Sequence, residues 1–403
     1  MVQTRTPPST RAGRWEKQQA GPEPFFCFIP TALPPDPALQ YDPDLQDLEE
    51  RANRALGRLD AVTSFLPSPK QFLYTYVRKE AVLSSQIEGT QSSLSDLLLF
   101  ENEETPGVPI VDVREVSNYV RAMEHGLNRL RKDLPLSLRL LREIHGILLK
   151  DVRGGDKEPG EFRRSQNWVG GSRPGNAIYV PPPPHEVMTA LGALEKFLHN
   201  DPVKMPTLMK AGLVHAQFES IHPFLDGNGR LGRLLITFIL SAEGALSQPL
   251  LYLSLYFKQN RAAYYEILQR IRTNGEWERW LKFYLEGVEQ VSTQAADTTR
   301  KLLHMFDEHR HRIQGLGKSA ASALHVHDLL KERIVLSLGT AAAELDLSFP
   351  TVAKAMENLE KLGFVKEFTG KQRNRVFSYE PYMKILHEGT EPIKQAGSWQ
   401  GHG

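Results

Sequence analysis

Residues 222–233 read HPFLDGNGRLGR, and this stretch decides how the rest of the chain is interpreted. His222 supplies a titratable base, Asp226 a carboxylate, residues 227–229 a turn of small residues, and Arg230 and Arg233 two cations. A base, a carboxylate, an anion-binding turn and cations can hold a magnesium–triphosphate and take a proton from an attacking hydroxyl. The stretch therefore predicts a phosphate-handling site.

The turn within this stretch is suited to an anion. Gly227 and Gly229 can adopt positive φ and let a phosphate approach the backbone closely. Asn228 tolerates a left-handed conformation and adds side-chain amide donors. A turn of this kind that opens a helix directs successive N–H groups at one point, so we expect these three residues to contact phosphate oxygens.

A dinucleotide-binding interpretation is disfavoured, although residues 227, 229 and 232 spell G-x-G-x-x-G. That fingerprint needs a preceding strand and an acidic residue about 20 positions later, at the end of a second strand. Residues 209–218 have a helical pattern, and Glu243 falls at an expected helix end. The sequence also has no G-x-x-x-x-G-K-S/T phosphate loop.

Residues 222–233 resemble the signature of the Fic family, His-Pro-Phe-x-(Asp/Glu)-Gly-Asn-Gly-Arg-x-x-Arg, at every specified position. The resemblance implies a helical fold. Because most Fic proteins move AMP from ATP to a hydroxyl of a target protein, it also implies a nucleotidyltransferase that uses ATP and Mg²⁺. Acceptors would be Ser, Thr or Tyr side chains of target proteins, and self-modification stays open.

The resemblance gives each polar residue of the signature a role. His222 would be the general base, because a histidine is largely neutral yet basic near neutral pH. Asp226 would hold Mg²⁺, which prefers carboxylate and phosphate oxygens. The turn at 227–229 would cradle the phosphates. Arg230 would add a cation, and Arg233, one helical turn later, would reach the terminal phosphate.

A second motif lies upstream, at residues 84–89, which read SSQIEG. Ser84, Glu88 and Gly89 resemble the inhibitory motif that one class of Fic proteins carries, Ser/Thr-x-x-x-Glu-Gly/Asn. The alternative is an ordinary helix end in which Gly89 follows the last turn. In the inhibitory interpretation Glu88 pairs with Arg233 and competes with the γ-phosphate for its guanidinium, which predicts a self-inhibited enzyme.

Residues 154–184 are rich in Gly, Pro and polar side chains, and long loops of this kind usually have a function. The segment PGEFR at 159–163 and the run that begins with Asn176, Ala177, Ile178 and Tyr179 resemble the Fic loop and flap that dock targets. A β-prone run can offer a free strand edge to an extended peptide. A plain surface hairpin is the alternative.

Composition sets outer limits on function. The net charge of the 403 residues is +1, which disfavours a global attraction to nucleic acid or membrane. The single cysteine excludes an internal disulfide and fits a reducing compartment. Residues 1–24 lack the apolar core of a signal peptide, and no run of about 18 apolar residues occurs. We expect a cytoplasmic protein without a membrane partner.

Helical periodicity dominates from Asp44 to about Arg300, which predicts a mainly α fold. Tyr264, on one of these helices, could stack near the nucleotide, although an aromatic at helical spacing is more often a core residue. The expected divisions are a disordered segment at 1–24, an N-terminal helical region with the inhibitory motif at 25–110, a Fic catalytic domain at 111–300, a winged helix–turn–helix (α+β) domain at 319–384 and a flexible tail at 385–403.

The spacing within 319–384 predicts two helices joined by a turn, with Ser348 as the N-cap of the second, followed by paired strands. Lys371, Arg373 and Arg375 on the wing could meet phosphates. The expected recognition helix balances lysines against glutamates, whereas DNA binding usually requires a basic face. A protein-interaction or dimerisation role is therefore favoured over DNA, and a homodimer is a reasonable assembly.

Two clusters, His304/His309/His311 and His325/His327/Asp328, lack the second ligand pair of a structural zinc site, so we expect solvated helix faces there. Two other functions stay open. The same glutamate could position a water for removal of AMP from modified proteins. A DNA-binding regulator could use the Fic body only to sense nucleotide, although such a sensor has no need of a general base.

Overall fold

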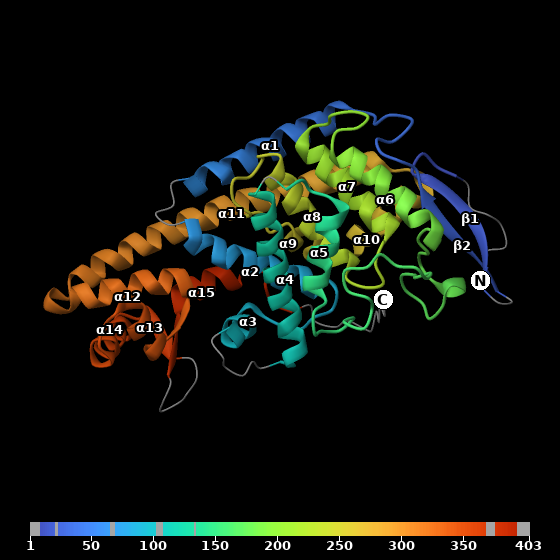
Figure 1. Cartoon of the computed structure of the whole chain (residues 1–403). Coiled ribbons are helices and arrows are strands. Elements are labelled where there is room, and N and C mark those ends of the chain that lie inside the picture. Colours follow the sequence, from blue (N-terminus) through green and yellow to red (C-terminus); the bar gives the residue numbers. More distant parts are fainter. Residues whose placement is uncertain are drawn as a thin grey trace.

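The computed structural model describes residues 9–20, 23–64, 69–101, 108–132, 134–367 and 375–392. These residues form a mainly α protein, as the periodicity predicts, with the described strands confined to one hairpin and one small sheet (Figure 1). The helices of the body are α1 (Pro43–Ser64), α2 (Pro69–Ile87), α3 (Leu94–Glu101), α4 (Ile110–Leu130), α5 (Leu138–Leu148), η1 (Pro174–Asn176), α6 (Pro184–Leu198), α7 (Thr207–Ile221), α8 (Asn228–Ala242), α9 (Ser254–Gln259), α10 (Arg261–Asn274) and α11 (Trp277–Gln314).

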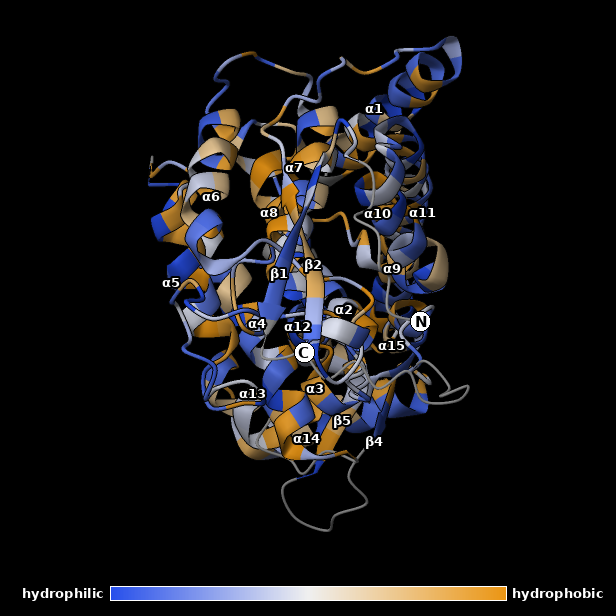
Figure 2. Ribbon diagram, turned by 90° about the vertical axis from the view of Figure 1, so that its right-hand side faces the viewer, coloured by the Kyte–Doolittle hydropathy of each residue, from blue (hydrophilic) through white to orange (hydrophobic). Residues whose placement is uncertain are grey.

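Helices α7 and α8 form the centre of the body. In α7 every residue from Leu208 to Ile221 is buried, and α8 is buried almost throughout its length. Figure 2 shows both helices largely hydrophobic and surrounded by other helices. A helix that is buried all round must sit in a core. The loop that joins α7 to α8 contains the HPFLDG half of the motif, so the candidate site is anchored to two buried core helices.

Helix α11 is the longest element and connects the body to the C-terminal unit. Helix α1 runs along its first half (Figure 1). The α11 residues Trp277 and Trp280 are fully buried, and Trp280 donates a hydrogen bond to the Gly212 carbonyl of α7 at 2.8 Å. This hydrogen bond fixes α11 to the core helix α7.

In the described part of the chain no helix combines the length and apolarity that a bilayer crossing requires.

The expectation of a disordered segment at 1–24 is wrong for the residues that the structure describes there. Strand β1 (Gly13–Ala20) pairs antiparallel with β2 (Glu23–Pro30). Strand β1 is polar, which is why the sequence indicated no core, whereas β2 carries buried Phe28 and Ile29 (Figure 2). Trp15 of β1 packs on Phe28 with ring centroids 5.1 Å apart, so pairing with an apolar strand orders the polar one.

The C-terminal unit has its elements in the predicted order. After α12 (Ala320–Arg333) come β3 (Val335–Ser337), α13 (Leu338–Leu345), α14 (Phe349–Lys361), β4 (Val365–Glu367), β5 (Val376–Tyr379) and α15 (Glu380–His387), with the strands ordered β3-β5-β4. Ser348 caps α14 by accepting from the Thr351 N–H, as expected. Lys371 and Arg373 lie outside the described residues.

The expected flexible tail at 385–403 is wrong for residues 385–391. Helix α15 continues to His387, and the segment after it lies against α2. Lys79 of α2 donates to the Glu388 carbonyl at 2.8 Å, and Gln86 of α2 donates to the Thr390 carbonyl at 2.9 Å. Thr390 is only 2% exposed. Buried lysine and glutamine donors that find main-chain acceptors in this segment hold it in place.

Two of the histidines expected on solvated faces are buried instead. His309 Nδ1 and His327 Nε2 lie 2.7 Å and 2.8 Å from the same Tyr379 hydroxyl, and His309 stacks on Phe364. A tyrosine hydroxyl can donate one hydrogen bond and accept another, so each ring has one nitrogen paired with Tyr379, whereas His327 Nδ1 is buried without a partner among the described residues. Within the described residues no cluster of three or more metal-binding side chains occurs.

Candidate active site

The loop between α7 and α8 begins and ends with left-handed residues. His222, the C-cap of α7, has φ 49° and ψ 60°, and Gly227, the N-cap of α8, has φ 74°. One left-handed residue ends α7 and the other immediately precedes α8, and only the second position carries a glycine. A histidine at positive φ costs free energy, so the surrounding contacts must hold it there.

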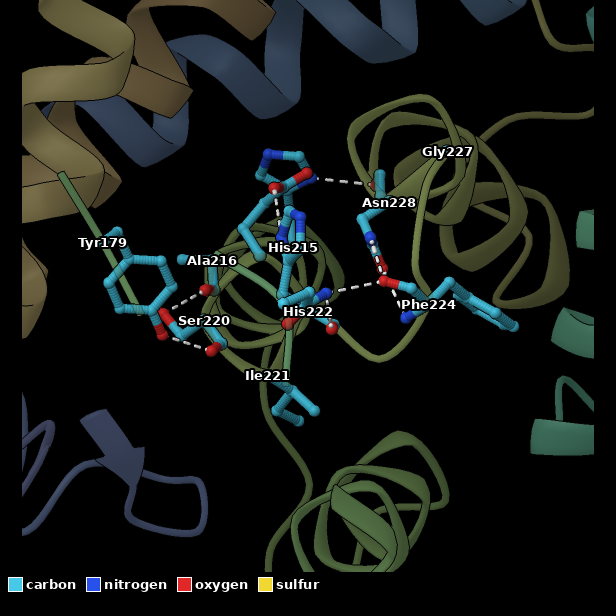
Figure 3. A network of polar contacts seen from close by, with 12 residues as sticks. Tyr179, His215, Ala216, Ser220, Ile221, His222, Phe224, Gly227 and Asn228 are labelled. Carbon is cyan, nitrogen blue, oxygen red and sulfur yellow. Dashed lines mark hydrogen bonds and ion pairs between the residues drawn. The ribbon is translucent and has the colours of Figure 1, made fainter. Parts of the chain in front are cut away.

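Asn228 closes the loop with its side chain. Its Oδ1 accepts from the Phe224 N–H at 2.9 Å, and its Nδ2 donates to the Phe224 carbonyl at 2.8 Å (Figure 3). The sequence predicted that these amide donors meet phosphate, and that prediction is wrong because the amide is committed to Phe224 and the residue is 2% exposed. What Asn228 offers an anion is its main-chain N–H at the start of α8.

His145 of α5 supports the loop from the other side. Its ring stacks on Phe224 with centroids 3.7 Å apart. The Gly160 N–H donates to His145 Nδ1 at 2.8 Å, so Nε2 carries the proton and donates to the Asp226 carbonyl at 2.9 Å. Burial lowers the pKa of His145 to about 4, which keeps this ring neutral and the tautomer fixed at neutral pH.

Two arginines cap the carboxyl end of α7. Arg163 donates to the carbonyls of His222 (2.9 Å), Ile221 (3.3 Å) and Pro182 (2.6 Å). Arg272 donates to the Glu219 carbonyl at 3.2 Å. Cations at a helix C-terminus satisfy the last carbonyls and the helix dipole together, and here they also fix the backbone of the histidine.

The environment of His222 defines which ring nitrogen can react. Its Nδ1 is fully buried, whereas the side chain as a whole is 20% exposed, so Nε2 is the nitrogen left to meet a substrate. Burial, followed by the charges of Arg163 and Arg272, lowers the pKa of His222 to about 3. The imidazole is therefore neutral at pH 7 and able to accept a proton.

Asp226 has the donor chemistry for a divalent cation. Its Oδ1 accepts the Gly227 N–H at 2.5 Å and lies 3.6 Å from Arg230 Nη2. Its Oδ2 faces Gly154, where a Cβ would lie 2.3 Å from that oxygen, so the glycine leaves this side of the carboxylate clear. One hard oxygen donor at the mouth of a phosphate site fits Mg²⁺, which keeps several waters and takes the remaining ligands from phosphates.

The first turn of α8 provides the anion site and one cation. Arg230, 3% exposed, lies 3.3 Å from Glu115 Oε2 of α4, which holds its guanidinium. The sequence allowed positive φ at both glycines of the turn, but only Gly227 has it, since Gly229 is helical. Gly229 is needed for space, because a Cβ there would lie 2.2 Å from Glu88 Oε1.

Arg233 is held entirely by the end of α2. Its Nη2 lies 2.6 Å from Glu88 Oε1, and its Nε and Nη2 donate to Ser84 Oγ and the Ser84 carbonyl at 2.8 Å and 3.0 Å. Burial alone would raise the pKa of Glu88, but the charge and hydrogen bond of Arg233 outweigh it and leave that pKa lowered. Glu88 follows the last residue of α2, and Gly89 has φ 99°. The segment is therefore also an ordinary helix end with a glycine after the last turn, as the alternative interpretation of the motif expected.

Tyr264 does not belong to the open site. It is 1% exposed, and its hydroxyl donates to His215 Nε2 at 2.8 Å, because His215 Nδ1 donates to the Gly232 carbonyl at 2.9 Å. The ring packs with Phe257 and Trp280 in the core. The aromatic spacing indicated a core residue, and the suggested stacking on a nucleotide is wrong because no ring face is accessible.

The predicted flap is a hairpin whose second edge is partly occupied. Tyr179 pairs with Val169, and Val180 accepts a hydrogen bond from the Phe28 N–H of β2 at 2.9 Å. Tyr179 is 2% exposed and bonds to the Ser220 carbonyl (Figure 3). The sequence suggested a fully free strand edge, and this prediction is wrong at Val180, whose carbonyl is already hydrogen-bonded to β2. Asn176 and Ala177 end the short helix η1, and Ile178 is 51% exposed beside them.

The sequence interpretation missed several residues that build the site. Glu219 and Arg272 approach His222, Glu115 holds Arg230, and His145 and Asn167 hold the loop, Asn167 by donating to the Phe224 carbonyl at 2.8 Å. Each is 15 or more residues from its partner or lies in an ordinary helical pattern, so no local signal marks it. Arg163 was visible only as part of the segment 159–163.

A helical core that presents a histidine, a carboxylate and an anion-binding helix start on one loop defines a Fic-type domain. Comparison with known proteins agrees: residues 46–128 match the Fic/DOC family N-terminal region and residues 135–240 match the Fic/DOC family. The two matched regions of the chain are therefore similar to the Fic/DOC family.

Similar curated proteins are named protein adenylyltransferase Fic. One from Drosophila willistoni is 28% identical over 255 residues, 61% of this chain and 48% of that protein, and one from Aedes aegypti is 29% identical over 270 residues, 64% and 50%. The chain spans about half the length of these relatives. A Fic family protein from Desulfovibrio desulfuricans shares the fold with a TM-score of 0.54 and 18% identity, covering 85% of this chain and 97% of that one.

Proposed function

We propose that this protein is a self-inhibited protein adenylyltransferase that moves AMP from Mg-ATP to a Ser, Thr or Tyr hydroxyl of a target protein. The observation that carries the proposal is the arrangement of His222, Asp226 and the start of α8 on one loop, with Glu88 bonded to Arg233 2.6 Å away. The names of the curated relatives support the choice of AMP transfer.

In the proposed reaction His222 Nε2 takes the proton of the target hydroxyl. The hydroxyl oxygen attacks the α-phosphorus of ATP, the bond to the bridging oxygen of the β-phosphate breaks, and pyrophosphate leaves. The N–H groups that open α8 and the cation of Arg230 stabilise the negative charge of the phosphates. Mg²⁺ held by Asp226 would supply further charge neutralisation.

Inhibition follows from competition for Arg233. Its guanidinium is the cation best placed one turn beyond Arg230 to bind a terminal phosphate, and Glu88 already occupies it. A phosphate must displace a charge-assisted hydrogen bond, worth about 1.5–3 kcal/mol, before the triphosphate can lie in line for attack. ATP that binds without this displacement has its reactive phosphorus misplaced.

Incubation with ATP labelled at the α-phosphate tests the proposal on four proteins: the parent, Glu88→Gly, His222→Ala, and the double variant. We expect label on protein to rise at least about tenfold with Glu88→Gly, since tenfold corresponds to about 1.4 kcal/mol. Label should be absent in both His222→Ala proteins. Glu360→Gly, which removes an exposed glutamate from the last turn of α14, is the matched control and should behave as the parent.

Other outcomes would replace the proposal. ATP that binds to Glu88→Gly without any transfer to protein would favour a nucleotide sensor. Loss of AMP from a modified protein with the parent, and not with Glu88→Gly, would favour removal of AMP. Equal labelling of the parent and Glu88→Gly would contradict self-inhibition while leaving the transferase in place.

A further inference from the structure

A buried carboxylate lies beside a buried ring nitrogen of the catalytic histidine. His222 Nδ1 and Glu219 Oε1 are both inaccessible to solvent, and neither makes a hydrogen bond of ordinary geometry to a described residue. The other carboxylate oxygen, Glu219 Oε2, lies 4.0 Å from His222 Nδ1. Buried polar atoms in folded proteins are nearly always paired, and the acceptors beside this ring nitrogen are the carboxylate and the main-chain carbonyl of Glu219.

The sequence spacing brings the Glu219 carboxylate close to the His222 ring. Glu219 lies on the last turn of α7 and His222 follows that helix directly, so the spacing of three residues puts both side chains on one side. Gly232 of α8 makes room for it, because a Cβ there would lie 2.6 Å from Glu219 Oε1. The family signature quoted above leaves both of these positions unspecified.

The histidine has a chemical need for such a neighbour. Arg163 donates to its carbonyl and Arg272 to the Glu219 carbonyl, and after burial their charges disfavour the imidazolium that must form when the target proton arrives. Glu88 acts in the opposite direction, but in the proposed function Glu88 leaves Arg233 when ATP binds. The main-chain carbonyl and the carboxylate of Glu219 remain beside the ring in either state.

We infer that Glu219 is a positioning residue for His222. Its carboxylate accepts the Nδ1–H hydrogen bond, which keeps the lone pair of Nε2 toward the target hydroxyl, and its charge stabilises the imidazolium after proton transfer. This inference rests on the proposed function for its catalytic meaning. The pairing of the two side chains is a property of the fold and can be measured without any transfer reaction.

The charges around the pair set the expected pH dependence. Glu219 faces Arg233 of α8, Arg272 of α10 and Glu88 after α2, while His222 also faces Arg163 of the loop that follows α5. Burial raises the pKa of Glu219 to about 7, with Arg233 opposing the shift. The carboxylate that the histidine requires is therefore lost as the pH falls below about 7, and the two groups titrate as a coupled pair.

The test compares Glu219→Gln with its parent in the Glu88→Gly background. We expect kcat to fall roughly 10- to 100-fold because the neutral amide cannot stabilise an imidazolium, with the KM for ATP changed less than about twofold. The fall in rate on the acid side of pH 7 should disappear from the pH profile. Glu115→Gln, which neutralises the buried carboxylate on Arg230, is the matched control and should raise the KM and keep the acid limb.

A second measurement separates this inference from the proposed function. In protein labelled with ¹⁵N-histidine, the ring signals absent from His222→Ala identify His222, and its Nδ1 shift should titrate near pH 7 in the parent but not in Glu219→Gln. An identical titration in both proteins would overturn the pairing, whatever the transfer assay shows. A changed titration in a protein that transfers no label would refute the transferase and leave the pairing in place.

Discussion

The loop that joins α7 to α8 and the segment that ends α2 meet at one arginine, yet they are held very differently. The loop is fixed by Asn228, His145, Arg163 and Asn167, each through two or more hydrogen bonds or a ring stack. Glu88 reaches Arg233 from the residue after a helix end, and 33% of its side chain is exposed. The groups proposed to react are each held by several contacts, whereas the side chain of Glu88, the group proposed to block the site, is held through its bond to Arg233.

This difference explains why the second region is suited to regulation. A side chain that is held through one charge-assisted bond can leave at a cost of about 1.5–3 kcal/mol, without disturbing the core. A loop held by many mutually supporting bonds keeps its geometry when the blocking group departs. Substitutions in the two regions should therefore have opposite signs in a transfer assay.

The largest effect is expected from breaking the loop at Arg163. Arg163→Met keeps the volume but leaves the carbonyls of Pro182 and Ile221 without this donor, and leaves the His222 carbonyl only its 3.3 Å bond from Asn167. Since each unsatisfied buried group costs about 1–3 kcal/mol, we expect the protein to lose at least about 2 kcal/mol of stability and transfer to fall more than about 100-fold. Urea unfolding and α-phosphate labelling in the Glu88→Gly background measure the two effects.

The neighbouring residue provides the control for this prediction. Arg164→Met removes the same charge from an exposed position one residue later and should change neither the unfolding midpoint nor the rate appreciably. If Arg163→Met unfolds and reacts like Arg164→Met, the carbonyls at the end of α7 do not fix the histidine.

The next effect, of opposite sign, concerns the blocking contact. Glu88→Gln keeps the shape of the side chain but removes its charge, which turns a charge-assisted bond to Arg233 into a neutral one. We expect transfer to rise about tenfold, less than with Glu88→Gly, and the KM for ATP to fall. Initial rates at several ATP concentrations measure both, with Glu388→Gln as the control. A rate that stays at the parental level would mean that shape, rather than charge, blocks the site.

The two regions also differ in how far the sequence predicts them. The roles proposed for the loop come from twelve consecutive residues, and the pairing of Arg233 with Glu88 was predicted through a family resemblance across 145 positions. The supports of the loop were not predicted, because Arg163, Glu219 and His145 approach it from helix ends and turns whose meeting depends on the whole fold. Asn228 was assigned to phosphate because composition cannot tell an amide that binds a ligand from one that closes its own turn.

Strand pairing and helix packing account for the remaining differences. Strand β1 is too polar to indicate order by itself, and only the register with β2 reveals its place. Long helical periodicity, by contrast, is a local property, so the helices of the body were predicted well. His309 and His327 looked solvated because the residue that buries them, Tyr379, comes from a strand more than 50 positions away.

Acid should weaken the loop before it weakens the blocking pair. The pKa of His145 is lowered to about 4 by burial, so between about pH 6.5 and pH 4 the unfolded chain takes up a proton that the folded state refuses, and stability falls with pH by up to about 1.4 kcal/mol per unit. The pKa of Glu88 lies below its usual value, so its pair with Arg233 contributes fully above about pH 4.3 and is lost only below it.

Urea unfolding at pH 7, 6 and 5 measures this difference. The midpoint should fall with pH in the parent and fall less in His145→Gln, whose amide can still donate to the Asp226 carbonyl without titrating. His199→Gln, at an exposed helix end, should retain the slope of the parent. Equal slopes in parent and His145→Gln would show that the loop histidine does not govern the acid response.

The smallest effect tests whether the C-terminal segment helps to hold the blocking group. Gln86 precedes Glu88 by two residues, and its Nε2 donates to the carbonyls of Ser92 and Thr390 at 2.8 Å and 2.9 Å. Gln86→Ala removes a tie between the end of α2 and the segment after α15, at a net cost of about 0.5–1.5 kcal/mol per bond. Because Glu88 then loses part of its support, we expect labelling to rise about two- to fivefold. Ser95→Ala removes a 2.9 Å contact between α3 and His387 of the same C-terminal helix and leaves α2 untouched, so a rise seen equally in both variants would mean that the C-terminal unit acts on the body as a whole, not through the residues that precede Glu88.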